Sequence, residues 1–173
     1  FCIGIFLFDK GPSHASASDY FRTDRIGSKS VLAFFGMVMF AYAAALICQA
    51  LLINGMFSIG ISPISEDYLT EEDLSPTYLA VSFVTTAILA PIAEELMFRG
   101  TLFRNAEKCG QLTGIIMVGL TFGLWHGSYQ QILYAAVMGM CACFMVAKTG
   151  SIFPSLILHF TMNTIGAIQS VAL

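Results

Sequence analysis

Two adjacent glutamates and one arginine interrupt an apolar run that begins at Tyr78. Charged side chains inside a membrane-type helix are costly, and where they occur they usually serve a function. Glu95 and Arg99 have the i,i+4 spacing of a helical ion pair, with the acid first, which is the favourable order. Glu94 points about 100° away from Glu95 and lacks that partner. An unpaired carboxylate in an apolar site suits general base work near neutral pH. The structural alternative is that Glu94 caps or braces a neighbouring helix.

Two histidines lie farther along the chain, each in an apolar segment. His126 ends the sequence FGLWH, with Phe122 one helical turn earlier. His159 and Asn163 are four residues apart and share one helical face. Asn163 could therefore orient the imidazole or donate to an oxyanion. Simpler alternatives are a structural hydrogen bond for His126 and an interhelical polar clamp for the second pair.

Two hydrolytic chemistries fit these side chains. In the first, Glu94 and His126 activate a water, while His159 and Asn163 stabilise the developing oxyanion. In the second, Glu94, His126 and His159 bind zinc, as in catalytic sites with two histidines and one glutamate. The chain has no HExxH sequence, so the zinc ligands would have to come from three helices. No serine lies in a GxSxG setting, which argues against a nucleophilic triad.

The composition indicates that the candidate residues lie in membrane helices. The chain has 173 residues, of which 57% are hydrophobic and 11% charged, whereas about 25% is usual in soluble domains. We therefore expect an all-α, polytopic transmembrane helical bundle in contact with membrane lipid. No basic patch suggests nucleic acid as a partner. Five spans are expected, at 31–61, 77–91, 112–127, 129–148 and 151–173. The first is either one long span or bends near Asn54-Gly55. The second has a kink at Pro91 and continues as a helix to about residue 108.

Residues 1–30 are expected to form the tail of an earlier span followed by a polar connection, and residues 31–173 the bundle. Basic residues before the spans at 31, 112 and 151 place those ends in the cytoplasm and the acidic loop 62–76 outside. Counted at about 1.5 Å per residue from the cytoplasmic helix ends, the four candidate residues lie at depths of roughly 13 to 22 Å. They could therefore meet in one layer inside the bilayer. These are Glu94, His126, His159 and Asn163.

Three motifs in order resemble those of the CPBP family, the CAAX-protease and bacteriocin-processing group of intramembrane proteases, also called Abi proteins. The family pattern EExxxR matches residues 94–99, FxxxH matches 122–126, and HxxxN matches 159–163. The resemblance covers about residues 77–170, the protease-like core. It does not extend to residues 1–76.

The resemblance implies peptide-bond hydrolysis in a membrane-associated peptide or protein, of the CAAX type or in bacteriocin and peptide processing. Glu94 would be the water-activating base, His126 its partner, and His159 with Asn163 the oxyanion pair. Glu95, Arg99 and Phe122 would be supporting residues. Zinc is a possible cofactor, because the family is often labelled metalloprotease. The short chain suggests a bacterial cell membrane.

Two other classes of protein remain open from the sequence. A non-catalytic membrane scaffold or immunity protein would keep its function without Glu94 and His159. A proton-coupled transporter could also use intramembrane Glu and His, but the low helix count and the lack of a visible inverted repeat argue against it.

Overall fold

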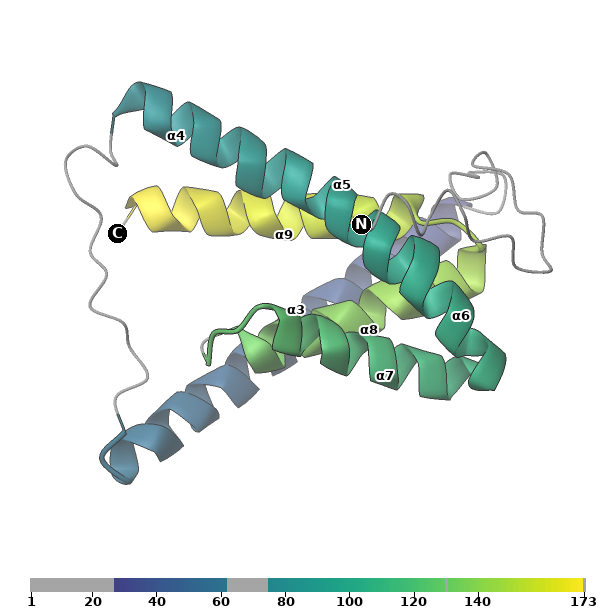
Figure 1. The fold of residues 1–173 in the computed structure, drawn as a ribbon, viewed down its shortest axis with the longest axis horizontal. Helices are drawn as coiled ribbons and strands as arrows, with labels where there is room; N and C mark the ends of the chain where they lie inside the picture. The colour runs from purple at the N-terminus through teal and green to yellow at the C-terminus, as the bar shows by residue number, and fades with distance from the viewer. Residues whose placement is uncertain (1–26, 62–74, 130, 173) are drawn as a thin grey trace.

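The computed structural model describes residues 27–61 and 75–172, except residue 130. These residues form helices connected by short turns (Figure 1). The bounds are α3 Ser28–Ser58, α4 Pro76–Phe83, the π-helical segment η1 Val84–Leu89, α5 Ala90–Glu95, the π-helical segment η2 Leu96–Phe103, α6 Arg104–Ala106, the 3₁₀ turn η3 Glu107–Cys109, α7 Gln111–Trp125, α8 Ile132–Thr149 and α9 Phe153–Ala172.

Helix α8 is central to the bundle. It contacts α3, α7 and α9, and Figure 1 shows it between α3 and α7. The segments from α4 to η3 form one nearly continuous rod, whose middle part lies beside α9. The site residues therefore come from three neighbouring elements: this rod, α7 and α9.

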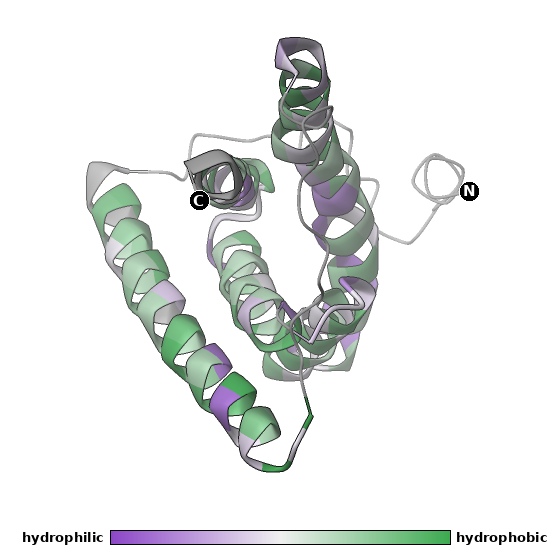
Figure 2. Ribbon diagram, turned by 90° about the vertical axis from the view of Figure 1, so that its left-hand side faces the viewer, coloured by the Kyte–Doolittle hydropathy of each residue, from purple (hydrophilic) through white to green (hydrophobic). Residues whose placement is uncertain are grey.

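The expected all-α membrane bundle is confirmed. Three helices in the described part of the chain are long and apolar enough to cross a membrane: Val31–Ser58, Pro76–Cys109 and Ile132–Thr149. Their outer surfaces carry large apolar side chains, such as Leu32 and Phe40, which are 73% and 77% exposed. Figure 2 shows that most helical residues are hydrophobic and that few are hydrophilic. Such a surface suits lipid rather than water as the surrounding solvent.

The boundaries differ from the expectation in several places. Helix α3 continues through Asn54 and Gly55 to Ser58, so the helix is not interrupted there. Two of the five expected spans, 112–127 and 151–173, form apolar helical stretches that are shorter, Gln111–Trp125 and Phe153–Ile168. The expected earlier span and nearly all of the polar connection, together with most of the acidic loop 62–76, lie outside the described residues.

Pro91 and Glu95 adjoin two π-helical segments. Pro91 has no backbone N–H to donate to the preceding turn, and the segment η1 ends directly before its helix, with the N–H of Ala90 bonded to the carbonyl of Thr85. The second segment, η2, follows Glu95 and contains Arg99. π-Helical turns are rare and often occur at functional sites. Here they flank α5, the short helix that carries both glutamates.

Glycines allow α7 and α8 to approach closely. A Cβ atom added at Gly123 would lie 2.5 Å from the carbonyl oxygen of Ile132 and 2.7 Å from the Cβ of Ala136. A Cβ added at Gly139, on the facing side of α8, would lie 3.1 Å from the Cα of Gly119. Small residues at such positions are a common basis of helix association in membranes. This contact fixes Phe122 and His126 relative to α8.

We predict that Gly123→Ala destabilises the bundle, because the added methyl group pushes against the backbone of α8. Overpacking of this kind costs about 1–3 kcal/mol. The matched control is Gly55→Ala on α3, where an added Cβ has nothing within 4 Å and a better helix former should be neutral or stabilising by about 0.5–1 kcal/mol. The unfolding midpoint of the purified protein in detergent measures both. Equal midpoints for the two variants would contradict the close approach of α7 and α8.

Candidate active site

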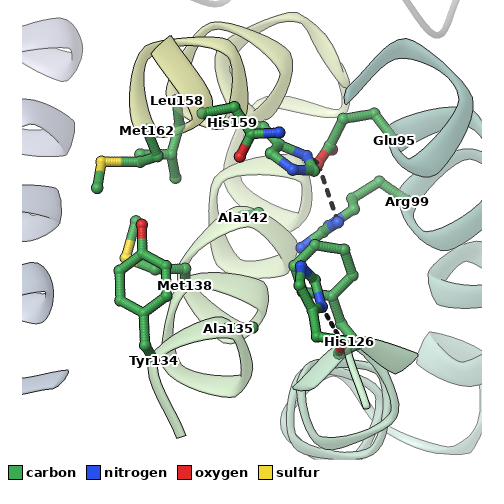
Figure 3. A pocket seen from close by; sticks show the side chains of 12 residues that line it. Glu95, Arg99, His126, Tyr134, Ala135, Met138, Ala142, Leu158, His159 and Met162 are labelled. Atoms are coloured by element: carbon green, nitrogen blue, oxygen red, sulfur yellow. Dashed lines mark hydrogen bonds and ion pairs between the residues drawn. The ribbon is translucent and has the colours of Figure 1, made fainter. Parts of the chain in front are cut away.

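Glu95 has several polar partners in the site. Its Oε1 lies 2.9 Å from Nη1 of Arg99, and both side chains are 1% exposed. The expected i,i+4 ion pair is thus confirmed (Figure 3). The hydroxyl of Ser155 donates to Oε2 at 2.7 Å, and Nδ1 of His159 lies 3.0 Å from Oε1. Partners on η2 and α9 therefore surround a carboxylate that ends α5.

The guanidinium of Arg99 is held on its other side as well. Its Nη2 donates to the carbonyl of Gly139 on α8 at 3.3 Å, and its Cζ lies 4.3 Å from the ring centroid of Phe122 on α7. A buried ion pair is stable only when further hydrogen bonds compensate the loss of water. The contacts of Arg99 and Glu95 provide part of that compensation, since Nε of Arg99 has no hydrogen-bond partner among the described residues. They also connect the rod to α7, α8 and α9.

Glu95 also sets the orientation of His159. An ionised carboxylate can only accept hydrogen bonds, so the 3.0 Å contact places a hydrogen on Nδ1. The other ring nitrogen, Nε2, then faces Oε2 of Glu94 at 3.6 Å. Orientation of the imidazole by Asn163, one of the expected roles, does not occur. The Asn163 amide donates instead to the carbonyl of Thr86 at 2.9 Å, because the helical turn carries it toward η1.

Glu94 differs from its neighbour in both exposure and contacts. Its side chain is 21% exposed, and its Oε2 atom is buried without a hydrogen-bond partner. Within the described residues, its charged contact is the one with His159. Of the two adjacent carboxylates, Glu94 is therefore the one with a free oxygen.

His126 lies at the C-terminal end of α7, and its side chain is also oriented. Nδ1 lies 2.8 Å from the carbonyl oxygen of Phe122. A carbonyl only accepts, so Nδ1 carries a hydrogen and Nε2 of the neutral ring is an acceptor. The Phe122 ring packs edge-on against both imidazoles, with centroids 4.8 Å from His126 and 5.5 Å from His159. One aromatic side chain therefore positions both histidines.

A pocket of about 350 Å³, which includes its open mouth, contains most of these groups. One part of its lining is polar and the other is largely apolar, as Figure 3 shows. The polar part comprises Glu95, Arg99, His126, His159 and Asn163, and the other part Phe122, Tyr134, Ala135, Met138, Ala142, Leu158 and Met162.

The proposed zinc ligands do not converge. Among the described residues, no group of three or more His, Cys, Asp or Glu side chains is arranged to hold a metal ion. Glu94 and His159 face each other, and the bond from Nδ1 of His159 to Glu95 leaves Nε2 available, but His126 does not join them as a third ligand. Among residues 27–61 and 75–172, the donor set does not fit a zinc centre.

Two residues of the site were not found by sequence reasoning. Ser155 lies four residues before His159, so the spacing alone puts both on one face of α9. A serine in an apolar helix, however, commonly bonds its own backbone, and Ser155 is also 2.8 Å from the carbonyl of Ile152. Tyr134 carried no signal, since a tyrosine in an apolar helix is ordinary.

Comparisons with known proteins agree with the motifs. Residues 76–165 match the family model of type II CAAX prenyl endopeptidases, Rce1-like. A curated protein of Escherichia coli, described as an uncharacterized 24.3 kDa protein, is 27% identical over 128 residues. The alignment covers 68% of this chain and 59% of that protein, so the chain spans less than two thirds of its relative. No solved structure gives a significant match. Because the matched model covers more than half of the chain, the chain belongs to the Rce1-like family of type II CAAX prenyl endopeptidases.

Proposed function

We propose that the chain is a CAAX-type intramembrane endopeptidase of a bacterial cell membrane, and that it cleaves a membrane-associated peptide or protein near the cytoplasmic face. Family membership supports peptide hydrolysis, and the curated relative is a protein of Escherichia coli. The observation that carries the mechanism is the difference between two adjacent glutamates. Glu95 is enclosed by Arg99, Ser155 and His159, whereas Glu94 keeps an oxygen without a hydrogen bond.

Glu94 is the base in this mechanism. A water placed beside Oε2 of Glu94 and Nε2 of His159, which are 3.6 Å apart, can lie about 2.8 Å from each atom. Glu94 takes a proton from this water, and the oxygen attacks the carbonyl carbon of the substrate. The same proton then passes to the leaving amine. His126 helps Glu94 to activate the water. It acts through Nε2, which can accept a hydrogen because Nδ1 is bonded to the carbonyl of Phe122.

The oxyanion is stabilised by His159 and Asn163. Asn163 uses one N–H of its amide for the carbonyl of Thr86, and its second N–H can donate to the developing charge. His159 donates through Nε2 when it is protonated, with Glu95 holding the ring from the other nitrogen. Donors that are already oriented lower the barrier most in a site that excludes water.

Glu94→Gln is predicted to lower kcat by about 10²–10⁴-fold, because glutamine cannot accept the proton from water. The probe is an internally quenched farnesylated peptide that ends in a CAAX sequence, and cleavage is measured by the fluorescence increase in detergent. The matched control is Glu107→Gln, since Glu107 is distant in the fold and pairs only loosely with Arg104 at 3.8 Å. This control should keep kcat within twofold.

Full hydrolysis by the Glu94→Gln variant would overturn Glu94 as the base. If the wild-type protein cleaved no such peptide, and its biological effect survived loss of both Glu94 and His159, the non-catalytic scaffold would be the better account.

Arg99→Met is predicted to cost about 3–5 kcal/mol in the free energy of unfolding, because it leaves the carboxylate of Glu95 buried without its cation. Adding Glu95→Gln to this variant should restore part of the loss, since it removes the unbalanced charge. Lys108→Met is the control, because Lys108 is exposed and bonds only Asn105 within the described residues; it should change stability by no more than about 0.5 kcal/mol. Denaturant unfolding followed by tryptophan fluorescence measures all three. A double variant less stable than Arg99→Met would contradict the bracing role.

A further inference from the structure

Tyr134 is a polar residue of the pocket that the proposed mechanism does not use. It lies on α8 and lines the pocket together with His126 and His159. Figure 3 shows it across the pocket from Arg99 and Glu95, with its hydroxyl directed toward Met162 and Leu158. Glu95 and Arg99 are thus on one side of the pocket and a single phenol is on the other.

The Tyr134 ring is fixed, but its hydroxyl is open. The ring packs edge-on against Tyr42 of α3, with centroids 5.7 Å apart and an interplanar angle of 78°. No hydrogen bond to the hydroxyl is found among the described residues, and its pocket neighbours Met138, Leu158 and Met162 offer no strong acceptor. Tyrosine hydroxyls in apolar surroundings usually have a partner. A positioned donor that faces a pocket without one indicates a ligand oxygen.

The other donors of the pocket are already assigned. Arg99 contacts Glu95 and Gly139, and its Nε, which has no hydrogen-bond partner among the described residues, belongs to a side chain that is fully buried. The ring of His159 is held by Glu95, and Asn163 donates to Thr86. The free donors of these last two are assigned to the oxyanion in the proposed mechanism. Among the described lining side chains that are not fully buried, Tyr134 is the remaining donor that can bind the substrate away from the scissile bond.

The apolar walls around Tyr134 indicate which substrate oxygen it binds. Alanine, methionine and leucine side chains accommodate apolar side chains of a peptide, which leaves the peptide main chain as the group that needs a donor. An unpaired main-chain oxygen costs several kcal/mol where water is excluded. We infer that Tyr134 is a substrate-binding residue whose hydroxyl donates to a main-chain oxygen of the substrate peptide, either a carbonyl or the terminal carboxylate. This inference rests on the proposed function.

Binding without cleavage tests the inference directly. In the Glu94→Gln background, fluorescence anisotropy measures the affinity for a labelled farnesylated CAAX peptide with a free C-terminal carboxylate, and for the same peptide amidated at its C-terminus. Tyr134→Phe keeps the ring pair and removes only the hydroxyl. Tyr42→Phe is the matched control on the other member of the pair. The expected result is affinity weakened about 5- to 20-fold by Tyr134→Phe, and by less than twofold by Tyr42→Phe.

The two peptides identify the oxygen. If the effect of Tyr134→Phe is found only with the free carboxylate, the terminal oxygen is the acceptor. If it is equal for both peptides, an internal carbonyl is the acceptor. Either result supports the inference. Equal affinities of the Tyr134→Phe and parent proteins for both peptides would overturn it.

Kinetics in the active protein separate this inference from the proposed function. Tyr134→Phe should raise KM with kcat within about twofold, because the contact is made in both the ground state and the transition state. A fall in kcat with unchanged KM would overturn the binding role. A wild-type protein that binds the peptide but does not cleave it contradicts the proposed function only. Absence of binding by the Glu94→Gln protein contradicts the Tyr134 contact.

Discussion

The buried ion pair of Glu95 and Arg99, with the further partners of Glu95, is the interaction on which this site depends. The carboxylate of Glu95 pairs with Arg99 and accepts hydrogen bonds from Ser155 and His159. Arg99 also donates to the carbonyl of Gly139. Three segments that are distant in the sequence, namely the rod, α8 and α9, therefore meet at one ion pair inside an apolar bundle. Its desolvation would be prohibitive without these partners, so the helices are held in the arrangement that provides them.

The same interaction separates the roles of two neighbouring glutamates. Arg99 neutralises the charge of Glu95, so the carboxylate of Glu94 does not lie beside a second uncompensated negative charge. Glu94 can therefore keep a free oxygen. Glu95 turns Nε2 of His159 toward that oxygen. Glycine-mediated packing of α7 on α8 then places Phe122 between the two histidines. The structural brace and the proposed chemistry are thus adjacent in the chain but differ in function.

Much of this arrangement follows from local spacing. The pairing of Glu95 with Arg99 and the helical, membrane-embedded fold were predictable, because i,i+4 contacts and hydropathy depend on neighbouring residues alone. The contacts between helices were not predictable from local spacing. His159 bonds Glu95 rather than Asn163, and this depends on how α9 is rotated against α5. Ser155 and Tyr134 gain their significance from residues 60 and 92 positions away, Glu95 and Tyr42. The π-helical segments also depend on tertiary packing, since local propensity does not favour them.

The central claim is that Glu94 acts and Glu95 braces. It is tested most directly by measuring kcat and the unfolding free energy together for Glu94→Gln and Glu95→Gln. The account predicts that Glu94→Gln loses nearly all activity with stability within about 0.5 kcal/mol of wild type, whereas Glu95→Gln loses about 3–5 kcal/mol of stability. The reverse pattern, a stable but inactive Glu95→Gln protein and an unstable Glu94→Gln protein that still cleaves, would contradict it.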